Sequence, residues 1–557
     1  MSFTEYIFIL LLMLTVVVYF CVPLKIRWTV LLFVSVLFFC TWGIEMLPFA
    51  LASTFITWGT ANIIEKWNVA FDNEVMANQE LDRKEKTILR NELKQKCKYL
   101  LWGAVALILS VLIYVKAQSY LAGIPVLENI VVLFSKVYKK VAMFCLNIPI
   151  LSFFVDYKDV YTDTSLYAFF VPLGISYYTM SLVAYMADVY WRKEKAEKNF
   201  FKLLLFVLYF PKILQGPISK HRNIRERLYE GSTFDYNRLC YGLQRILWGY
   251  LKKLVVADRL LLFVNPVFTD HFDYGGAMLF FAAIFSAFQL YCDFSGCMDI
   301  ALGASQIFGI ELEENFNRPF FAKSAAEFWN RWHKTLGQWF TDYIYMPIVI
   351  SPNLIKVSGK IKNVFGKRAA KNFVSIVPIA TVWIITGLWH GTGMNYIMWG
   401  VYWGLLMILS TVFSPEIKQV SKWIHLETES QWFQTFRQYR TFLLFVISRI
   451  FSTPSDITIS FDIFRKMFFD LRPWEIIDGT FFEVGLNEDN FKVIVVALFV
   501  LWSVMKKQEN GIVLREEIGK LPLLLRWSIY YMGLIILFIY GIYGPGFDAA
   551  SFVYMNY

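Results

Sequence analysis

The stretch TVWIITGLWHGTGMNYIMWGVYWG, from Thr381 to Gly404, is a strongly apolar run in which His390 is the one side chain that titrates near neutral pH. The apolar run as a whole extends from Phe373 to Phe413 and would be about 60 Å long as a single helix, twice the hydrocarbon core of a bilayer. The chain must therefore turn back. Because Gly391 and Gly393 directly follow the histidine, we expect two membrane helices with His390 at the turn between them.

Apolar residues are gathered in long blocks along all 557 residues, of which 57% are hydrophobic and 18% aromatic. The blocks long enough to cross a bilayer are Met1–Val22, Trp28–Ile64, Tyr99–Val115, Tyr167–Met186, Ala277–Tyr291, Phe373–Trp389 and Leu521–Tyr540. Glu5 rather than a basic region precedes the first block, so we expect a retained helix and not a signal peptide. With interrupted blocks included, the sequence predicts an all-α polytopic membrane protein of about 11 to 13 transmembrane or re-entrant helices.

Charged residues indicate which ends of these helices face the cytoplasm. The net charge is +10, but in a membrane protein the distribution of Lys and Arg matters more than their sum, and the sequence predicts no nucleic-acid partner. Basic clusters occur at Arg83–Lys98, Arg192–Lys198 and Lys356–Lys371, which we expect in cytoplasmic loops. Acidic residues prevail in Asp156–Asp163 and in Asp456–Asp489, which we expect outside.

This sidedness also places the histidine of the opening stretch. The helix Phe373–Trp389 begins just after the basic loop Lys356–Lys371, so His390 is expected near the extracytoplasmic end of the helix. The next helix should begin at about Met394 and return to the cytoplasm. Gly400 and Gly404 have the spacing that lets two membrane helices approach closely.

Several catalytic classes lack their motifs in this chain. The sequence contains no G-x-S-x-G, no P-loop and no H-E-x-x-H, which argues against serine hydrolases, ATPases and zincins. Its seven cysteines are scattered without zinc-ligand spacing, so we expect free, buried thiols and no metal site. His221, His271 and His425 lie in polar stretches, and we assign them no role.

A second aromatic stretch, Glu314–Ile348, is too polar for an ordinary lipid-facing helix. On one continuous helix Trp329, His333 and Phe340 would share a face, with Trp332 on the neighbouring face and Arg331 among the charges. We expect an interfacial or re-entrant amphipathic helix here. A simple basic and aromatic interfacial anchor remains an alternative.

Titratable groups in apolar surroundings are candidates for function because their burial is costly. A neutral imidazole such as that of His390 can take the proton of an attacking hydroxyl group, which is the central step of acyl transfer. The alternative is an imidazole bonded into helix packing. Asp293 and Asp299 lie in another apolar block, where the alternatives are a cation or proton path and a buried structural cap.

Three motifs together resemble the signature of the membrane-bound O-acyltransferase family, nearest to its prokaryotic polysaccharide branch, which serves alginate O-acetylation and teichoic acid D-alanylation. They are FWNRWH (Phe328–His333), DYIYMPI (Asp342–Ile348) and GLWHG (Gly387–Gly391). The similarity also includes VPLGISYYTMSLVAYMADVYW from Val171, YFPKILQGPI from Tyr209, YCDFSGCMDIALG from Tyr291, ENFNRPF from Glu314 and TFLLFVISRIF from Thr441. Where relatives usually continue YIPLGG, this chain has YMPIVISPN.

The resemblance implies a ring of helices around a central tunnel and assigns roles to individual residues. His390 matches the family's catalytic histidine, and His333 matches a position that lines the cytosol-facing end of the acyl path. Trp332, Trp389, Asp293 and Arg331 are candidates for lining the acyl path or supporting it. Residues 171–404 would form the catalytic core of a single integral membrane domain, and residues 414–557 would add C-terminal helices with an acidic extracytoplasmic loop.

The expected function is transfer of an acyl group, acetyl from acetyl-CoA, across the plasma (inner) membrane for O-acylation of a cell-surface or exported polysaccharide. The donor would bind at the cytoplasmic side, no cofactor would remain bound, and a separate extracytoplasmic acyltransferase would be a partner. One alternative is transfer of D-alanine from a carrier protein to teichoic acid. Another is a proton-coupled transporter or flippase, in which His390 and Asp293 would form a relay.

Overall fold

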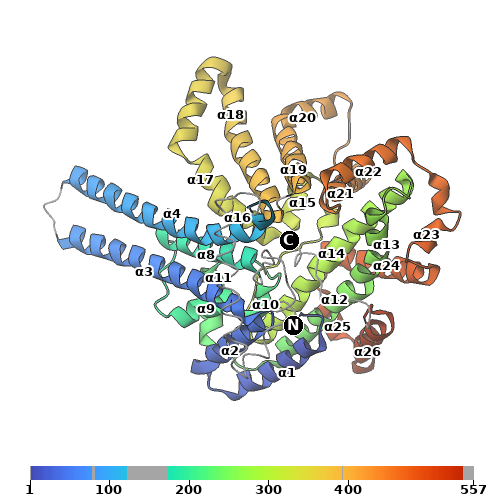
Figure 1. Ribbon diagram of the computed structural model, residues 1–557, viewed down its shortest axis with the longest axis horizontal. Coiled ribbons are helices and arrows are strands. Elements are labelled where there is room, and N and C mark those ends of the chain that lie inside the picture. The colour runs from blue at the N-terminus through green and yellow to red at the C-terminus, as the bar shows by residue number, and fades with distance from the viewer. Residues whose placement is uncertain (1, 78–81, 122–173, 392, 544–557) are drawn as a thin grey trace. The chain divides into compact units, whose positions relative to one another are not determined.

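The computed structural model describes residues 2–77, 82–121, 174–391 and 393–543, and all regular elements in these ranges are helical (Figure 1). This confirms the all-α prediction. Six helices of the described residues are long and apolar enough to cross a membrane, which fits a multi-pass membrane protein. The predicted total of 11 to 13 helices stays a prediction. The acidic segment Asp156–Asp163 and Cys145 lie outside the described residues.

The chain divides into two compact units, Met1–Leu239 with Ala304–Leu312, and Cys240–Gly303 with Glu313–Tyr557. The helices of the first unit are α1 (Tyr6–Cys21), α2 (Arg27–Cys40), α3 (Leu47–Ala77), α4 (Arg83–Leu121), α8 (Ile175–Tyr190), α9 (Phe200–Leu208), α10 (Phe210–Ile213) and α11 (His221–Glu230). The apolar block Trp28–Ile64 therefore holds parts of two helices, separated at Gly43, whose φ of 133° favours glycine.

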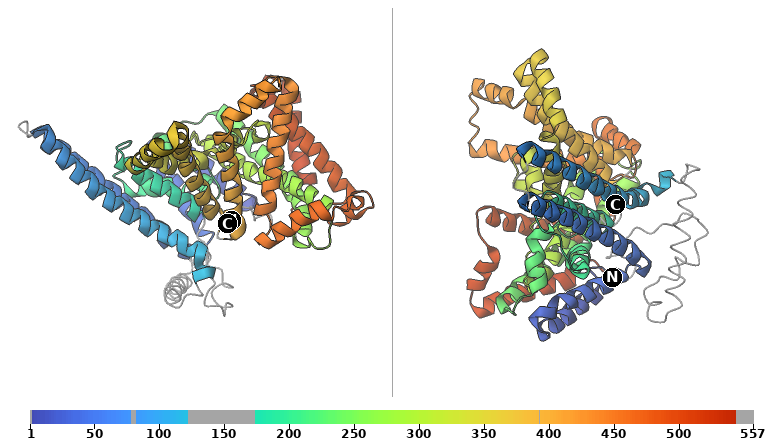
Figure 2. Two further views of the ribbon diagram at one scale, coloured as in Figure 1. Left: turned by 90° about the horizontal axis from the view of Figure 1, so that it is seen from above. Right: turned by 90° about the vertical axis from the view of Figure 1, so that its left-hand side faces the viewer.

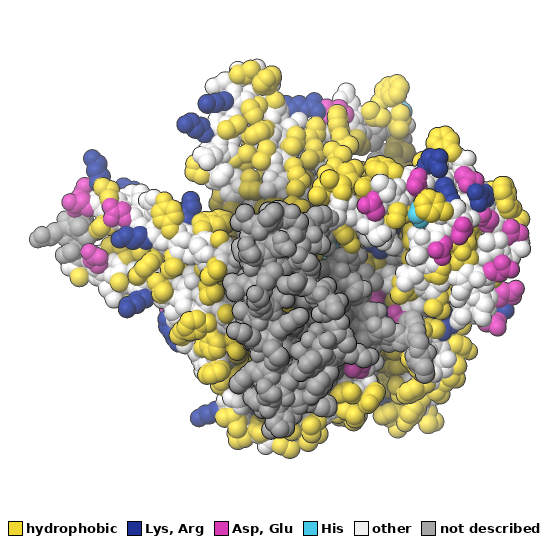
Figure 3. Space-filling model, in the orientation of Figure 1, with side chains coloured by type: hydrophobic (Ala, Val, Ile, Leu, Met, Phe, Trp, Pro, Cys, Tyr) yellow, Lys and Arg dark blue, Asp and Glu magenta, His cyan; other side chains and the backbone are white. Residues whose placement is uncertain are grey.

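Helices α3 and α4 lie side by side in all views (Figures 1 and 2), and charged side chains gather at their shared end (Figure 3). The basic cluster Arg83–Lys98 is thus the first part of a long helix rather than a loop. In the same unit, His221 is buried, and its ring nitrogens lie 2.8 Å from Glu194 Oε2 and 3.0 Å from Tyr229 Oη. His221 is thus buried at the start of α11 although it lies in a polar stretch, because a partnered imidazole can be buried among polar sequence neighbours.

The second unit contains the remaining helices and both histidines of interest. These helices are α12 (Tyr236–Tyr250), α13 (Asp258–Thr269), α14 (Gly276–Ile307), α15 (Ala325–Arg331), α16 (Lys334–Phe340), α17 (Met346–Val349), α18 (Pro352–His390), α19 (Met394–Val412), α20 (Ser414–Trp423), α21 (Gln431–Ser452), α22 (Ile457–Phe469), α23 (Thr480–Glu483), α24 (Glu488–Glu509), α25 (Leu514–Lys520) and α26 (Leu523–Tyr540). Exposed carboxylates gather around α23 and the start of α24, at the right of Figure 3.

Helix α18 ends at His390 and α19 begins at Met394, as the glycine turn predicted. The basic segment Lys356–Lys371, however, is not an open loop. It belongs to α18 and folds back on itself at Gly366, where φ is 85°, so that the hydroxyl of Ser358 donates to the carbonyl of Ala370. Glycine takes up this φ at little steric cost, and the basic residues therefore sit on a helical hairpin.

The stretch predicted as one amphipathic helix is broken in the middle. Helix α15 ends at Arg331, Trp332 is extended (φ −104°, ψ 128°), His333 is left-handed (φ 46°, ψ 50°), and α16 starts at Lys334. The expected shared face of Trp329, His333 and Phe340 was therefore wrong. Backbone hydrogen bonds to the preceding segment account for the break, because Asn317 N–H donates to the carbonyl of Arg331 and Lys334 N–H to that of Asn315.

Aromatic rings fill the space between α15, α18 and α19. Trp329 packs edge-on against Trp383 and Trp403 with centroid distances of 5.0 Å each, and Phe328 stacks on Trp403 at 5.9 Å. Such pairs contribute about 0.5–1.5 kcal/mol each beyond their buried area. This cluster makes the three helices one packed body at the level of the FWNRWH and GLWHG motifs.

Candidate active site

His390 is held at the end of α18 by close contact between α18 and α19. A Cβ atom on Gly387 would lie 2.7 Å from the carbonyl oxygen of Tyr396, and one on Gly400 would lie 2.5 Å from that of Trp383. Side chains at these positions would push the helices apart. Gly400 thus allows the close approach that the spacing of Gly400 and Gly404 predicted, and Gly387 allows it from the facing helix. The His390 ring is 9% exposed and packs edge-on against Trp399 at 4.9 Å.

His333 is held by a polar side chain eighteen residues earlier in the chain. Asn315 Oδ1 lies 3.2 Å from His333 Nδ1, and it accepts hydrogen bonds from Thr335 N–H at 3.0 Å and from the Thr335 hydroxyl at 2.9 Å. Asn315 is 1% exposed and His333 is 3% exposed. The amide therefore fixes the junction between α15 and α16 from inside the protein.

These contacts determine the tautomer of His333. A backbone N–H can only donate, so the Asn315 atom that receives Thr335 N–H is the amide oxygen, and this oxygen can only accept. His333 Nδ1 must then carry the hydrogen that it donates. Burial lowers the pKa of His333 from 6.5 to about 3, which keeps the imidazole neutral. Nε2 is consequently the nitrogen with a lone pair.

The structure brings the two histidines to the same tryptophan. The ring centroid of Trp389 lies 6.3 Å from that of His333 and 4.8 Å from that of His390. Phe294 of α14 packs against the other side of this site, perpendicular to the His333 ring at 4.8 Å. Residues 57 positions apart in the sequence thus meet through one indole ring, which places two imidazoles and two aromatic rings in one buried region.

Trp332 is buried among aromatic rings rather than on a helix face. Its ring lies 5.0 Å from Phe316, 4.8 Å from Phe445 and 6.1 Å from Tyr291, and it is 3% exposed. These neighbours come from the segment before α15, from α21 and from α14. Trp332 therefore joins the break in the α15–α16 region to two long helices.

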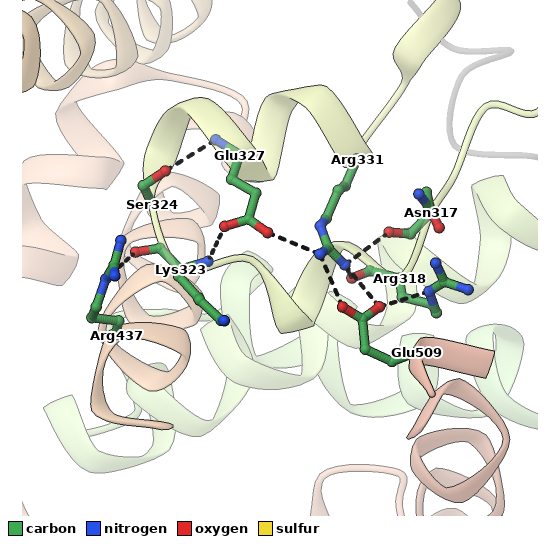
Figure 4. Close-up of polar contacts among 8 residues, drawn as sticks. All are labelled: Asn317, Arg318, Lys323, Ser324, Glu327, Arg331, Arg437 and Glu509. Atoms are coloured by element: carbon green, nitrogen blue, oxygen red, sulfur yellow. Dashed lines mark hydrogen bonds and ion pairs between the residues drawn. The ribbon is translucent and has the colours of Figure 1, made fainter. Parts of the chain in front are cut away.

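Arg331 secures the end of α15 to the end of α24 (Figure 4). Its guanidinium group donates to both carboxylate oxygens of Glu509 at 2.9 Å and lies 2.8 Å from Glu327. Arg318 contacts the same Glu509 carboxylate at 2.8 Å. The hydrogen bonds that Arg331 donates to Glu509 raise the pKa of Arg331. Bidentate pairs of this kind define orientation as well as distance, so Arg331 acts as a clamp next to Trp332 and His333.

Asp293 belongs to a buried ionic cluster in the second unit. Its Oδ1 lies 2.7 Å from Lys253 Nζ, which also lies 2.8 Å from Asp258 Oδ1. Asp299, two turns further along α14, pairs with Arg245 at 2.9 Å and with Lys252 at 2.5 Å. Buried charges require such partners. The pairing favours the structural interpretation of Asp293 over a proton path, although Asp293 directly precedes Phe294 at the histidine site.

Sequence reasoning missed two residues that the structure brings into these networks. Asn315 lies within ENFNRPF, a motif noted for its resemblance to the family, but nothing in the local pattern linked it to His333. Lys253 lies in an apolar run, and two adjacent lysines there were a usable signal that carboxylates of another helix must pair with them. Over the described residues, no group of three or more His, Cys, Asp or Glu side chains is arranged to hold a metal ion.

Residues 192–358 match the model of the membrane-bound O-acyltransferase family. The chain is similar to this family over that segment. This confirms the resemblance read from the motifs. The matched segment contains His333, Asn315, Arg331 and Asp293, and His390 follows it by 32 residues along the chain.

Curated relatives of this chain are acyltransferases by name. A protein of Pseudomonas aeruginosa named "Probable alginate O-acetylase" is 27% identical over 59% of this chain and 56% of its own length. The peptidoglycan O-acetyltransferase of Helicobacter pylori is 28% identical over 44% of this chain and 48% of its own. The teichoic acid D-alanyltransferase of Bacillus subtilis is 33% identical over 45% of this chain and 62% of its own. The chain thus spans about half the length of the curated relatives it matches.

Proposed function

We propose that this chain is a membrane O-acyltransferase in which His390 acts as the catalytic base and His333 as a neutral partner at the same site. The observation that carries the proposal is the meeting of the two imidazoles at Trp389, within 6.3 Å and 4.8 Å of its ring centroid. A buried, aromatic-walled site excludes water, which protects a reactive acyl donor from hydrolysis. The match to the acyltransferase family supports this chemistry.

In the proposed reaction, the oxygen of an acceptor hydroxyl group attacks the carbonyl carbon of a donor thioester. The new C–O bond forms, the C–S bond breaks, and His390 takes the hydroxyl proton and returns it to the departing thiolate. His333, whose Nδ1–H is directed to Asn315, presents its Nε2 lone pair as a hydrogen-bond acceptor. Because its pKa is about 3, His333 orients a hydroxyl group better than it removes a proton.

The acyl group we propose is acetyl, taken from acetyl-CoA at the cytoplasmic side and carried through a tunnel between the helices to a cell-surface or exported polysaccharide. The acetyl transferases among the relatives support this choice. The protein would reside in the plasma membrane and work with a separate extracytoplasmic acyltransferase. Trp389 and Trp332 would border the path of the acyl group.

D-alanyl transfer to teichoic acid is the second candidate, because a relative named for that activity has 33% identity to this chain, the highest of the three relatives above. The two reactions share the thioester chemistry and differ in the mass added to the acceptor. The transport alternative has less support, since the three relatives are all named as transferases or acetylases and Asp293 is paired with Lys253.

The test is mass spectrometry of surface polymers from cells with the wild-type chain, with His390→Ala, and without the protein. We expect the wild type to add acetyl groups and His390→Ala to lower the acylation rate by about 100-fold or more, the usual contribution of a general base. His425→Ala, which removes an exposed histidine, is the control and should retain acylation. An alanyl mass would select the second candidate, and full acylation with His390→Ala would refute the histidine mechanism.

A further inference from the structure

Two arginine side chains of α21 converge on one backbone carbonyl group of the segment that leads into α15. Arg437 Nε donates to the carbonyl oxygen of Lys323 at 3.3 Å, and Arg440 Nη2 donates to the same oxygen at 2.9 Å. Figure 4 shows Arg437 beside Lys323, at the start of the segment that leads into α15. Each guanidinium group has five N–H donors and uses one of them in its hydrogen bond to this carbonyl oxygen. The remaining donors of Arg437 and Arg440 form one cationic cluster.

No carboxylate neutralises this cluster in the part of the chain that the structure describes. Ion pairs there include none with the side chains of Lys323, Arg437 or Arg440. The neighbouring arginines Arg318 and Arg331 differ from this cluster, because both are paired with the carboxylate of Glu509. Two guanidinium groups on one acceptor repel each other, and partial burial strengthens that repulsion. Such an arrangement is stabilised when an anion lies between the cations.

The surroundings of the cluster are aromatic and exposed. On the first turns of α21, Trp432, Phe436 and Tyr439 are 71%, 47% and 71% exposed. The ring of Trp432 stacks on that of Phe436 at 5.9 Å, so exposed aromatic rings occupy the same turns of α21 as the arginines. From Thr441 the helix continues as an apolar run. Exposed Trp and Tyr beside basic residues, at the end of an apolar helix, are typical of the level of lipid headgroups.

We propose that Arg437 and Arg440 bind the phosphate group of an anionic phospholipid. The phosphate oxygens take the place of the missing carboxylate, since guanidinium groups bind phosphate through paired N–H donors. The aromatic side chains of α21 contact the glycerol and upper acyl region. A phosphate ligand that approaches from water would need the cations but not the exposed aromatic surface, so the structure favours a lipid.

A lipid at this place would connect α21 to the segment that carries the histidine site. The N–H of Lys323 donates to Glu327 at 2.9 Å, and Ser324 caps α15, whose far end leads to His333. Glu327 is in turn paired with Arg331. Binding therefore holds the start of α15 against α21 without touching either histidine. This inference does not depend on the proposed acyl transfer.

The experiment is native mass spectrometry of the purified full-length protein in detergent, with equal amounts of phosphatidylglycerol and phosphatidylcholine of the same acyl chains. The wild type should retain phosphatidylglycerol in preference. Arg437→Gln and Arg440→Gln should each lower the ratio of retained phosphatidylglycerol to phosphatidylcholine about fivefold, the ordinary effect of one basic residue at an anionic membrane surface. If one of these two variants does not fold, the other tests the site with the same expected change.

The matched control is Arg368→Gln, which removes an arginine that is already paired with Glu416 and should leave the ratio unchanged. Adenosine 3′,5′-bisphosphate serves as a water-soluble phosphate competitor. Loss of retained phosphatidylglycerol with this competitor would assign the site to a soluble ligand and overturn the proposal. An unchanged ratio in the folded arginine variants would overturn it as well.

Discussion

The two histidines of the candidate site are positioned by opposite means. His390 is the last residue of α18, and its position follows from the glycines that let α18 and α19 pack closely. His333 lies in a left-handed turn that is held by the amide of Asn315 and by backbone hydrogen bonds from distant sequence. Local chain geometry thus determines the first position, whereas a buried polar contact determines the second. The position of His333 should therefore be more sensitive than that of His390 to the replacement of a single polar residue.

Asn315→Leu should have the largest effect on this comparison. The substitution removes the common acceptor of the His333 ring, the Thr335 N–H and the Thr335 hydroxyl, at a buried position. We expect the free energy of unfolding to fall by about 3 kcal/mol or more, and acylation to be lost, because each buried donor without its acceptor costs about 1–3 kcal/mol. Thermal unfolding in detergent and polymer acylation measure the two effects.

Asn317→Leu is the control for this variant, since Asn317 is half-buried and the contacts that it makes at the junction are through its backbone. It should change stability by less than a third of the effect of Asn315→Leu. Equal losses in both variants would show that Asn315 matters only as one polar residue of the segment. The difference in sensitivity between the two histidines would then have no basis in the amide.

Gly387→Ala tests the other half of the comparison and should have an intermediate effect. The added Cβ would lie 2.7 Å from the backbone oxygen of Tyr396, so α18 and α19 must separate slightly. We expect a loss of about 1–3 kcal/mol in the free energy of unfolding, as for overpacking elsewhere. Gly359→Ala is the control in the same helix, because nothing lies within 4 Å of its Cβ position. An unchanged free energy of unfolding in Gly387→Ala would show that close packing does not position His390.

The contrast between these regions also explains what the sequence could predict. The turn after His390 was readable because glycine spacing and the length of a membrane helix are local properties. The break at Trp332 was not readable, since the aromatic pattern of Trp329, His333 and Phe340 continues in helical register through it. The contacts that break the helix come from Asn315 and Asn317, and periodicity contains no information about such partners.

The candidate site shows the same limit. The motifs indicated His333, His390, Trp389 and Trp332 one by one. The meeting of the two histidines at Trp389 was not readable, because it depends on how α14, α15, α18 and α19 pack. The partners of Asp293 were equally hidden, because Lys253 and Asp258 come from a different segment. Sequence reasoning thus identified side chains with unusual environments and left their pairing to the structure.

The pH dependence of the free energy of unfolding should show the smallest effect. It tests the region of His333, because this imidazole stays neutral in the folded protein at a pH where it is charged in the unfolded chain. Burial lowers the pKa of His333 from 6.5 to about 3, so below 6.5 the unfolded chain binds a proton that the folded protein does not. Stability should therefore fall as the pH falls below about 6.5, by on the order of 1 kcal/mol for each pH unit. His333→Gln removes this contribution. The loss of stability between about pH 7 and pH 5.5, measured by unfolding in detergent, should be smaller in that variant by on the order of 1 kcal/mol. If both proteins lose the same stability over this range, the buried neutral state of His333 is wrong, and with it the assignment of Nε2 as the acceptor.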